Sequence, residues 1–179
     1  MTNNEPINNV EWRNAADLHA NSWNPNVVFT PELRLLERSI LKCGWIQPVI
    51  VNPDGLVIDG FHRWRLSQDS AALKERYGGK LPVVVMNLSK PEAMLLTIRI
   101  NRAKGSHVAV QMSEIVKELV DTHNYDRRQI ADNIGATMDE IDLLYQDGVF
   151  KMKNIKDYKY SKAWYPRETK GTKGRNDAI

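Results

Sequence analysis

Hydrophobic residues recur at helical spacing in the first quarter of the chain. The Thr-Pro-Glu sequence at residues 30–32 combines an N-cap residue, a proline at the first helical position and an acid in the first turn. Four aliphatic side chains then fall on one helical face, and Gly44 follows. We therefore predict a helix from residue 30 to about Cys43, preceded by a turn-rich loop at residues 18–26 that follows a short strand or approach segment.

The next segments alternate between strand and helix patterns. Two β-branched runs, 47–51 and 56–58, are separated by Asn-Pro-Asp-Gly, which predicts a hairpin. A helix is predicted from Phe61 to about Leu73, followed by an apolar strand at 81–86 and a helix from Lys90 to about Ile100. This order favours a small α+β domain, which we place at residues 1–107.

From residue 112 the pattern is that of helices alone, at 112–122, 127–134 and 138–146. Ala131, Gly135 and the later aliphatic positions have the spacing of a helix-turn-helix, so residues 108–150 are predicted to form a helical domain. The last helix exposes three carboxylates and has no Arg, Lys, Asn or Gln before Gln146. Because such cations and amides read DNA, protein interaction or packing is favoured over sequence-specific DNA recognition.

Composition and charge narrow the class of protein. The chain has 179 residues, of which 42% are hydrophobic and 26% charged, as in globular proteins. Residues 151–179 hold nine Lys or Arg against three Asp or Glu, so the basic excess lies in a tail. We interpret this tail as a solvated segment or as an arm that binds a polyanion such as DNA. The single Cys43, the lack of a long apolar run and the polar amino terminus predict a cytoplasmic protein that does not enter a membrane.

The strongest chemical signal is the stretch at residues 57–65, where a short strand breaks at Gly60 into a helix that carries His62, Arg63 and Arg65. Such a turn presents unpaired backbone N–H groups, and the helix dipole adds positive charge there. Guanidinium groups suit phosphate oxygens. The pattern therefore predicts a phosphate or nucleotide site, with Arg65 alternatively forming a structural ion pair.

Several neighbouring side chains have two possible roles each. His62 either donates to a phosphate and serves as an acid or base, or makes a structural hydrogen bond. Asp59 either caps the following helix or binds Mg²⁺, and is a second candidate catalytic group. Gln47 either faces a base or makes a hydrogen bond at the strand edge. A second polar cluster follows the helix that begins at Lys90, and its candidate ligand-binding residues are Asn101, Arg102, Ser106 and His107.

Four segments, in this order, resemble the ParB/sulfiredoxin superfamily over residues 15–150. They are Asn-Pro-Asn at 24–26, Gly-Trp-Ile-Gln-Pro at 44–48, the box Gly-Phe-His-Arg-Trp-Arg-Leu at 60–66, and Asn-Arg-Ala-Lys-Gly-Ser-His at 101–107. The resemblance implies a nucleotide-binding domain followed by a helix-turn-helix domain. In chromosome-segregating ParB, CTP lies against the corresponding arginine box, so Asn101 and Arg102 are expected to contact phosphate or metal.

Two departures narrow what the resemblance implies. Phe61 stands where sulfiredoxin has its nucleophilic cysteine, which excludes reduction of cysteine sulfinate. Ile100 stands where ParB has the glutamate of a Glu-Asn pair that helps to hold magnesium, which argues against magnesium-dependent CTP hydrolysis. The His-Arg box is more similar to compact ParB-like proteins of phages and mobile elements, among them prophage gene co-activators.

Two functions follow as hypotheses. The first is a nucleotide-binding regulator of gene expression or DNA transactions that takes ATP or CTP, with or without Mg²⁺. Its expected partners are DNA through the basic tail, a protein through the helical domain and a second copy in a homodimer. The second is an enzyme, either a small-molecule kinase or a nuclease. In the kinase, His62 or Asp59 would be the base, and Arg63 and Arg102 would hold the phosphate.

Overall fold

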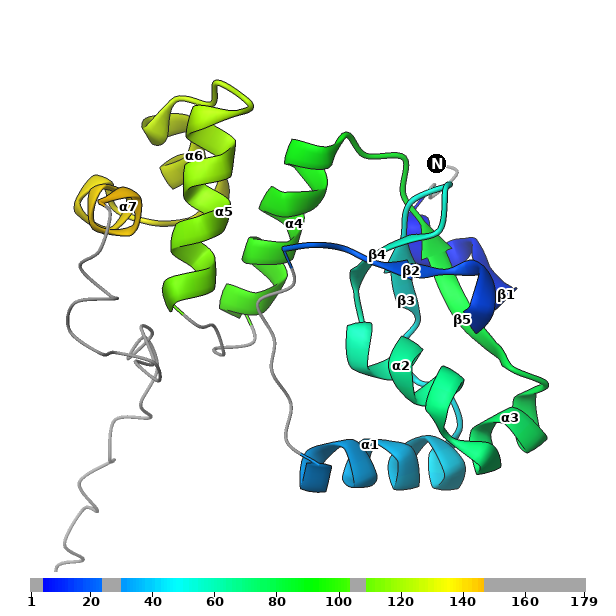
Figure 1. The fold of residues 1–179 in the computed structure, drawn as a ribbon. Coiled ribbons are helices and arrows are strands. Elements are labelled where there is room, and N and C mark those ends of the chain that lie inside the picture. Colours follow the sequence, from blue (N-terminus) through cyan, green and yellow to red (C-terminus); the bar gives the residue numbers. More distant parts are fainter. Residues whose placement is uncertain (1–4, 24–29, 104–108, 147–179) are drawn as a thin grey trace, which may run out of the picture.

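The computed structural model describes residues 5–23, 30–103 and 109–146, and its centre is a mixed five-stranded sheet (Figure 1). The strand order is β1-β5-β3-β4-β2. Strand β5 (Lys80–Val85) pairs antiparallel with β1 (Val10–Asn14) and parallel with β3 (Val49–Val51). Strand β4 (Leu56–Asp59) pairs antiparallel with β3 and parallel with the two-residue β2 (His19–Ala20). The predicted α+β class and the hairpin are confirmed.

The seven α-helices of the described ranges lie in two groups (Figure 1). The first group is α1 (Thr30–Cys43), α2 (Phe61–Asp69) and α3 (Ala71–Tyr77), and α2 packs on β3 and β5. Helix α4 (Lys90–Ala103) packs on β4 and lies between the sheet and the second group. That group is α5 (Ala109–Asp121), α6 (Arg127–Ile134) and α7 (Met138–Tyr145), as predicted apart from a residue or a few at the ends.

The predicted single helix from Phe61 to Leu73 is wrong, because the chain breaks at Ser70. This residue has an extended backbone, with φ −79° and ψ 118°, and its hydroxyl accepts a hydrogen bond from the Leu73 N–H. The same hydroxyl donates to the Glu37 carboxylate of α1. Ser70 is therefore the N-cap of a new helix, α3, and it fixes the angle between α2 and α3.

The sequence did not predict the position of the edge strand β1 or the short strand β2. Val10 and Trp12 of β1 are 42% and 51% exposed, so the strand lacks the buried face that produces an apolar alternation. Strand β1 is positioned by its antiparallel pairing with β5 and not by a buried face of its own. Strand β2 lies inside the predicted loop and has two residues, too few for any periodicity.

The largest hydrophobic cluster lies on α4 and not on the sheet. It joins α4 to α5, α6 and α7 through fully buried side chains, with Ile58 of β4 and Trp23 at its margin. Two smaller clusters lie under α2 and between α1 and α3. The predicted domain boundary at 107/108 and the tail at 151–179 fall outside the described residues. Within the described ranges, no helix has the length and apolar content needed to cross a bilayer.

Candidate functional site

The turn between β4 and α2 has the geometry of an anion site. Gly60 is the N-cap of α2 and adopts a left-handed conformation, with φ 92° and ψ 24°, and no side chain caps the helix. A Cβ atom at this position would lie 3.0 Å from Val49 Cγ2 and 3.0 Å from Arg63 Nη2. The positive φ and these tight contacts disfavour any side chain here, and the N-cap glycine supplies no side-chain cap, which leaves the positive end of the helix dipole available to an anion.

The Arg63 side chain stabilises this turn through three hydrogen bonds. Its Nη1 donates to the carbonyl oxygens of Gln47 at 2.9 Å and Pro48 at 2.8 Å, and its Nη2 donates to Asp59 Oδ2 at 3.2 Å. The side chains of Arg63 and Asp59 are only 12% and 11% exposed. Burial lowers the pKa of Arg63, and the charge of Asp59 counteracts that shift. Arg63 therefore ties the start of α2 to the segment before β3, using three of its five N–H groups.

The other candidates on this turn differ in their surroundings. His62 is half-buried, and its ring meets the Phe61 ring edge to face at 5.7 Å. Phe61 stands where sulfiredoxin has its cysteine. Its ring packs against the Trp64 ring, with the two centroids 5.3 Å apart. Arg65 is exposed and pairs with Asp69 one turn further along α2, at 3.2 Å, which is the structural alternative given above. The Gln47 residue is exposed, and its backbone carbonyl accepts from Arg63.

Helix α4 brings Asn101 toward the same strand end. The Thr97 hydroxyl lies 3.2 Å from the carbonyl oxygen of Ile58 and 2.9 Å from that of Ala93. Asn101 follows one turn later on this face of α4 and is 2% exposed. It is therefore buried on the side of α4 that contacts β4, whose last residue is Asp59. Ser106 and His107 lie outside the described residues.

Arg102 points to a different part of the molecule. Its Nη1 pairs with Glu140 Oε1 of α7 at 2.5 Å, and its Nη2 donates to the Gly135 carbonyl at 3.2 Å. The expectation that three carboxylates of α7 are exposed is wrong for Glu140, whose side chain is 16% exposed because it faces α4. Arg102 thus joins α4 to the α6–α7 turn, one residue after Asn101.

This bridge is expected to show a measurable coupling. In a double-mutant cycle of Arg102→Ala and Glu140→Ala, we expect a coupling energy of about 1 to 2 kcal/mol in urea unfolding, because both groups are largely buried. The matched pair Arg127–Asp142 also ends on α7, but its side chains are 46% and 43% exposed. Its coupling should be about 0.5 kcal/mol or less. Equal coupling energies for the two pairs would contradict the conclusion that the Arg102–Glu140 bridge joins α4 to α7 more strongly.

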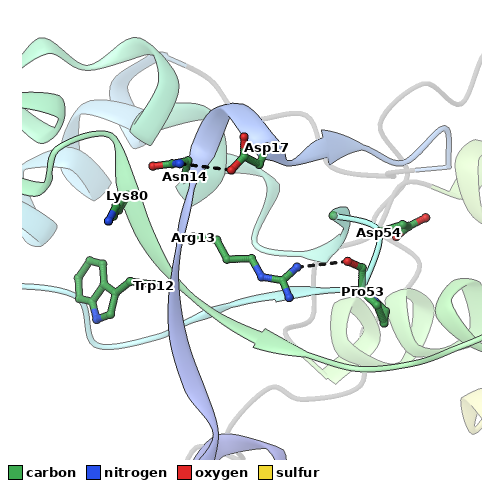
Figure 2. A pocket seen from close by; sticks show the side chains of 8 residues that line it. Trp12, Arg13, Asn14, Asp17, Pro53, Asp54 and Lys80 are labelled. Atoms are coloured by element: carbon green, nitrogen blue, oxygen red, sulfur yellow. Dashed lines mark hydrogen bonds between the residues drawn. The ribbon is translucent and has the colours of Figure 1, made fainter.

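A shallow cleft of about 410 Å³ lies elsewhere, between β1 and the 52–55 turn (Figure 2). Figure 2 shows the Arg13 side chain reaching toward the Pro53 carbonyl, 3.4 Å away, and Asn14 beside Asp17. Sequence reasoning missed this cleft because its wall is the unpredicted strand β1. The rest of its lining is one exposed indole, one acid, one glycine and one cation: Trp12, Asp54, Gly55 and Lys80.

A family model, the ParB N-terminal domain, matches residues 2–102. The chain belongs to the ParB N-terminal domain family. The match ends at Arg102, the last residue of the two candidate clusters that the structure describes. The departures at Phe61 and Ile100 are therefore differences within a ParB-type domain. The narrower likeness to phage and mobile-element proteins stays a prediction.

Individual relatives agree with the family. The uncharacterized protein YbdM of Escherichia coli K12 is 37% identical over 89% of this chain and 78% of its own length. The probable chromosome-partitioning protein ParB of Rickettsia bellii is 27% identical over 62% of this chain, but the aligned part is only 36% of that protein. The chain therefore corresponds to about a third of that ParB.

Solved structures show the same fold. The Pnob8-like ParB-N domain superposes with a TM-score of 0.58 and 14% identity, over 85% of this chain and 75% of that one. The truncated ParB from Caulobacter crescentus complexed to the centromeric parS site gives a TM-score of 0.50 and 20% identity, over 75% of this chain and 69% of that one. Both likenesses extend past the sheet into the helical region.

Proposed function

We propose that this chain is a ParB-like nucleotide-binding protein that acts in DNA transactions or gene expression, and that a nucleoside triphosphate docks its phosphates at the Gly60 turn. The observation that carries the proposal is the start of α2 at Gly60, a left-handed glycine that supplies no side-chain cap. Membership of the ParB N-terminal domain family supports a nucleotide as the anion.

The residues divide into two roles in this proposal. His62 and the first-turn backbone of α2 contact the phosphates, and Asn101 closes the site from α4. Arg63 is a positioning residue, because its guanidinium group donates to Asp59 and to two carbonyl groups. A magnesium ion would rely on the nucleotide's own oxygens, with Asp59 as the protein carboxylate nearest the turn. The proposed ligand is ATP or CTP, and the calorimetry described below distinguishes them.

The last turn of α4 offers a route from the nucleotide to the helical region. Asn101 faces the strand side, and the adjacent Arg102 is bonded to Glu140 and Gly135. A ligand that shifts this turn also shifts the α6–α7 contact, in proportion to its preference for one arrangement. A DNA role is supported by the name of the Rickettsia relative, a chromosome-partitioning protein.

The test is calorimetry with CTP, ATP, GTP and ADP on the full chain. We expect one triphosphate to bind, and His62→Ala to weaken it about tenfold, the value of one hydrogen bond to a charged group. Arg65→Ala is the matched control, since this exposed guanidinium pairs with Asp69 and should leave binding unchanged. Absence of binding by every nucleotide at millimolar concentration would remove the proposal.

The enzyme alternative gains no specific support. Asp59, one of the two candidate bases beside His62, has its Oδ2 engaged by Arg63. Among the residues that the structure describes, no three His, Cys, Asp or Glu side chains gather in a group suited to holding a metal ion. We therefore do not propose a kinase or a nuclease.

A further inference from the structure

The outer face of α1 carries a row of cations that no contact described above uses. Arg34, Arg38 and Lys42 are exposed and follow one another at intervals of four residues. At about 100° per residue, the three lie within about 80° of arc on one side of the helix. None of them forms a hydrogen bond or an ion pair with the described part of the chain.

Six of the other cations in the described ranges pair with a carboxylate. The acid in the middle of α1, Glu37, keeps its charge but lies about 60° around the helix from Arg34, where it accepts from the Ser70 hydroxyl. Arg76 of α3 donates to the Leu41 carbonyl at the end of α1 and adds one exposed cation there. The paired cations elsewhere are Arg13, Arg63, Arg65, Lys90, Arg102 and Arg127. The cations without an ion pair on other described elements come one or two to an element (Lys74, Arg76, Lys80, Arg99 and Arg128), so α1 is the described helix with a row of three.

The row matches a nucleic-acid backbone in length and in sign. Eight residues of helix extend about 12 Å, and one DNA strand carries about three or four phosphates over that distance. In contrast, α7 presents the exposed Asp139 and uses Asp142 to pair with Arg127. Figure 1 shows α1 at the lower edge of the molecule, with α2 and α3 above it and no other labelled element below.

We propose that α1 binds the phosphate backbone of DNA through Arg34, Arg38 and Lys42. This rests on the DNA role proposed above and assigns it to a surface other than α6–α7. A lipid surface is disfavoured, because the apolar face of α1 packs against α2 and α3. In α1 the large exposed aliphatic side chain is Leu35, and the helix has no aromatic residue.

The experiment compares two full-length triple variants of equal net charge. The test variant is Arg34→Gln, Arg38→Gln and Lys42→Gln. The control removes three exposed cations from other elements: Lys74→Gln, Arg99→Gln and Arg128→Gln. Fluorescence anisotropy with a labelled DNA duplex is recorded over a series of salt concentrations. We expect the test variant to bind about tenfold or more weakly, with a log–log salt slope shallower by about 2 to 3, and the control to stay near wild type.

The proposal is overturned if the test variant keeps the wild-type slope, if the control loses as much, or if the wild type binds no DNA at low salt. It is also overturned if the substitutions abolish binding to phosphatidylserine vesicles but not to DNA. Thermal unfolding of both variants excludes a folding defect, since the changed side chains are exposed. Nucleotide calorimetry on the same proteins separates the two proposals, because a failure of α1 to bind DNA leaves nucleotide binding intact.

Discussion

Replacing Arg63 by alanine is expected to lower the free energy of unfolding by about 3 to 5 kcal/mol, because it leaves the buried Asp59 carboxylate without its cation. The change also removes the donors to the carbonyl groups of Gln47 and Pro48. The measurement is urea denaturation followed by circular dichroism. A loss of nucleotide binding in this variant would therefore not show that Arg63 contacts phosphate.

Two further variants separate the ion pair from the rest of the effect. Adding Asp59→Asn to Arg63→Ala should recover part of the lost stability, since the unpaired charge is removed. Arg65→Ala should cost less than about 0.5 kcal/mol, because its pair with Asp69 is more than half exposed. Equal losses for Arg63→Ala and Arg65→Ala would contradict the structural role of Arg63.

The second large effect is expected at Gly55, in the turn between β3 and β4. Its φ is +92°, and a Cβ atom there would lie 2.6 Å from the carbonyl oxygen of Asp17. Left-handed strain and a backbone collision act together, so Gly55→Ala should cost about 3 kcal/mol. Thermal or urea unfolding of the full chain measures this loss.

Gly44 provides the matched control for Gly55. It also has a positive φ, +79°, but no atom lies within 4 Å of its would-be Cβ. Gly44→Ala should therefore show only the strain of the left-handed backbone, about 1 to 2 kcal/mol. If both variants lose the same stability, the Asp17 segment moves aside and the close contact has no energetic role.

Periodicity in the sequence predicted the elements that bury one face. The helix at 30–43, the hairpin and the three carboxy-terminal helices all have such a face, and each was placed to within a few residues. The exposed edge strand β1 has none, so the sequence indicated only a short strand or approach segment there, without its bounds. A polar cap at Ser70 divided a helix that its apolar pattern continued. Local patterns identify burial better than they identify chain direction.

The candidate site shows a different limit. A strand, a glycine and a cationic helix start predicted an anion-binding turn, and the structure places an uncapped helix start there. The partners of the arginines could not be predicted, because Gln47 and Pro48 come from another segment and Glu140 lies 38 residues beyond Arg102. The residue type shows which hydrogen-bond donors and charges a side chain has, whereas tertiary contacts decide which of them are already bonded within the protein.

The family match stops at residue 102, yet α4 shares its buried surface with everything that follows. Met94 and Ile98 belong to the buried cluster that α4 shares with α5, α6 and α7. A fragment cut at the family boundary would leave these side chains bare in water, and it would self-associate or precipitate. Biochemical work on this ParB-type domain therefore has to retain the residues through Tyr145.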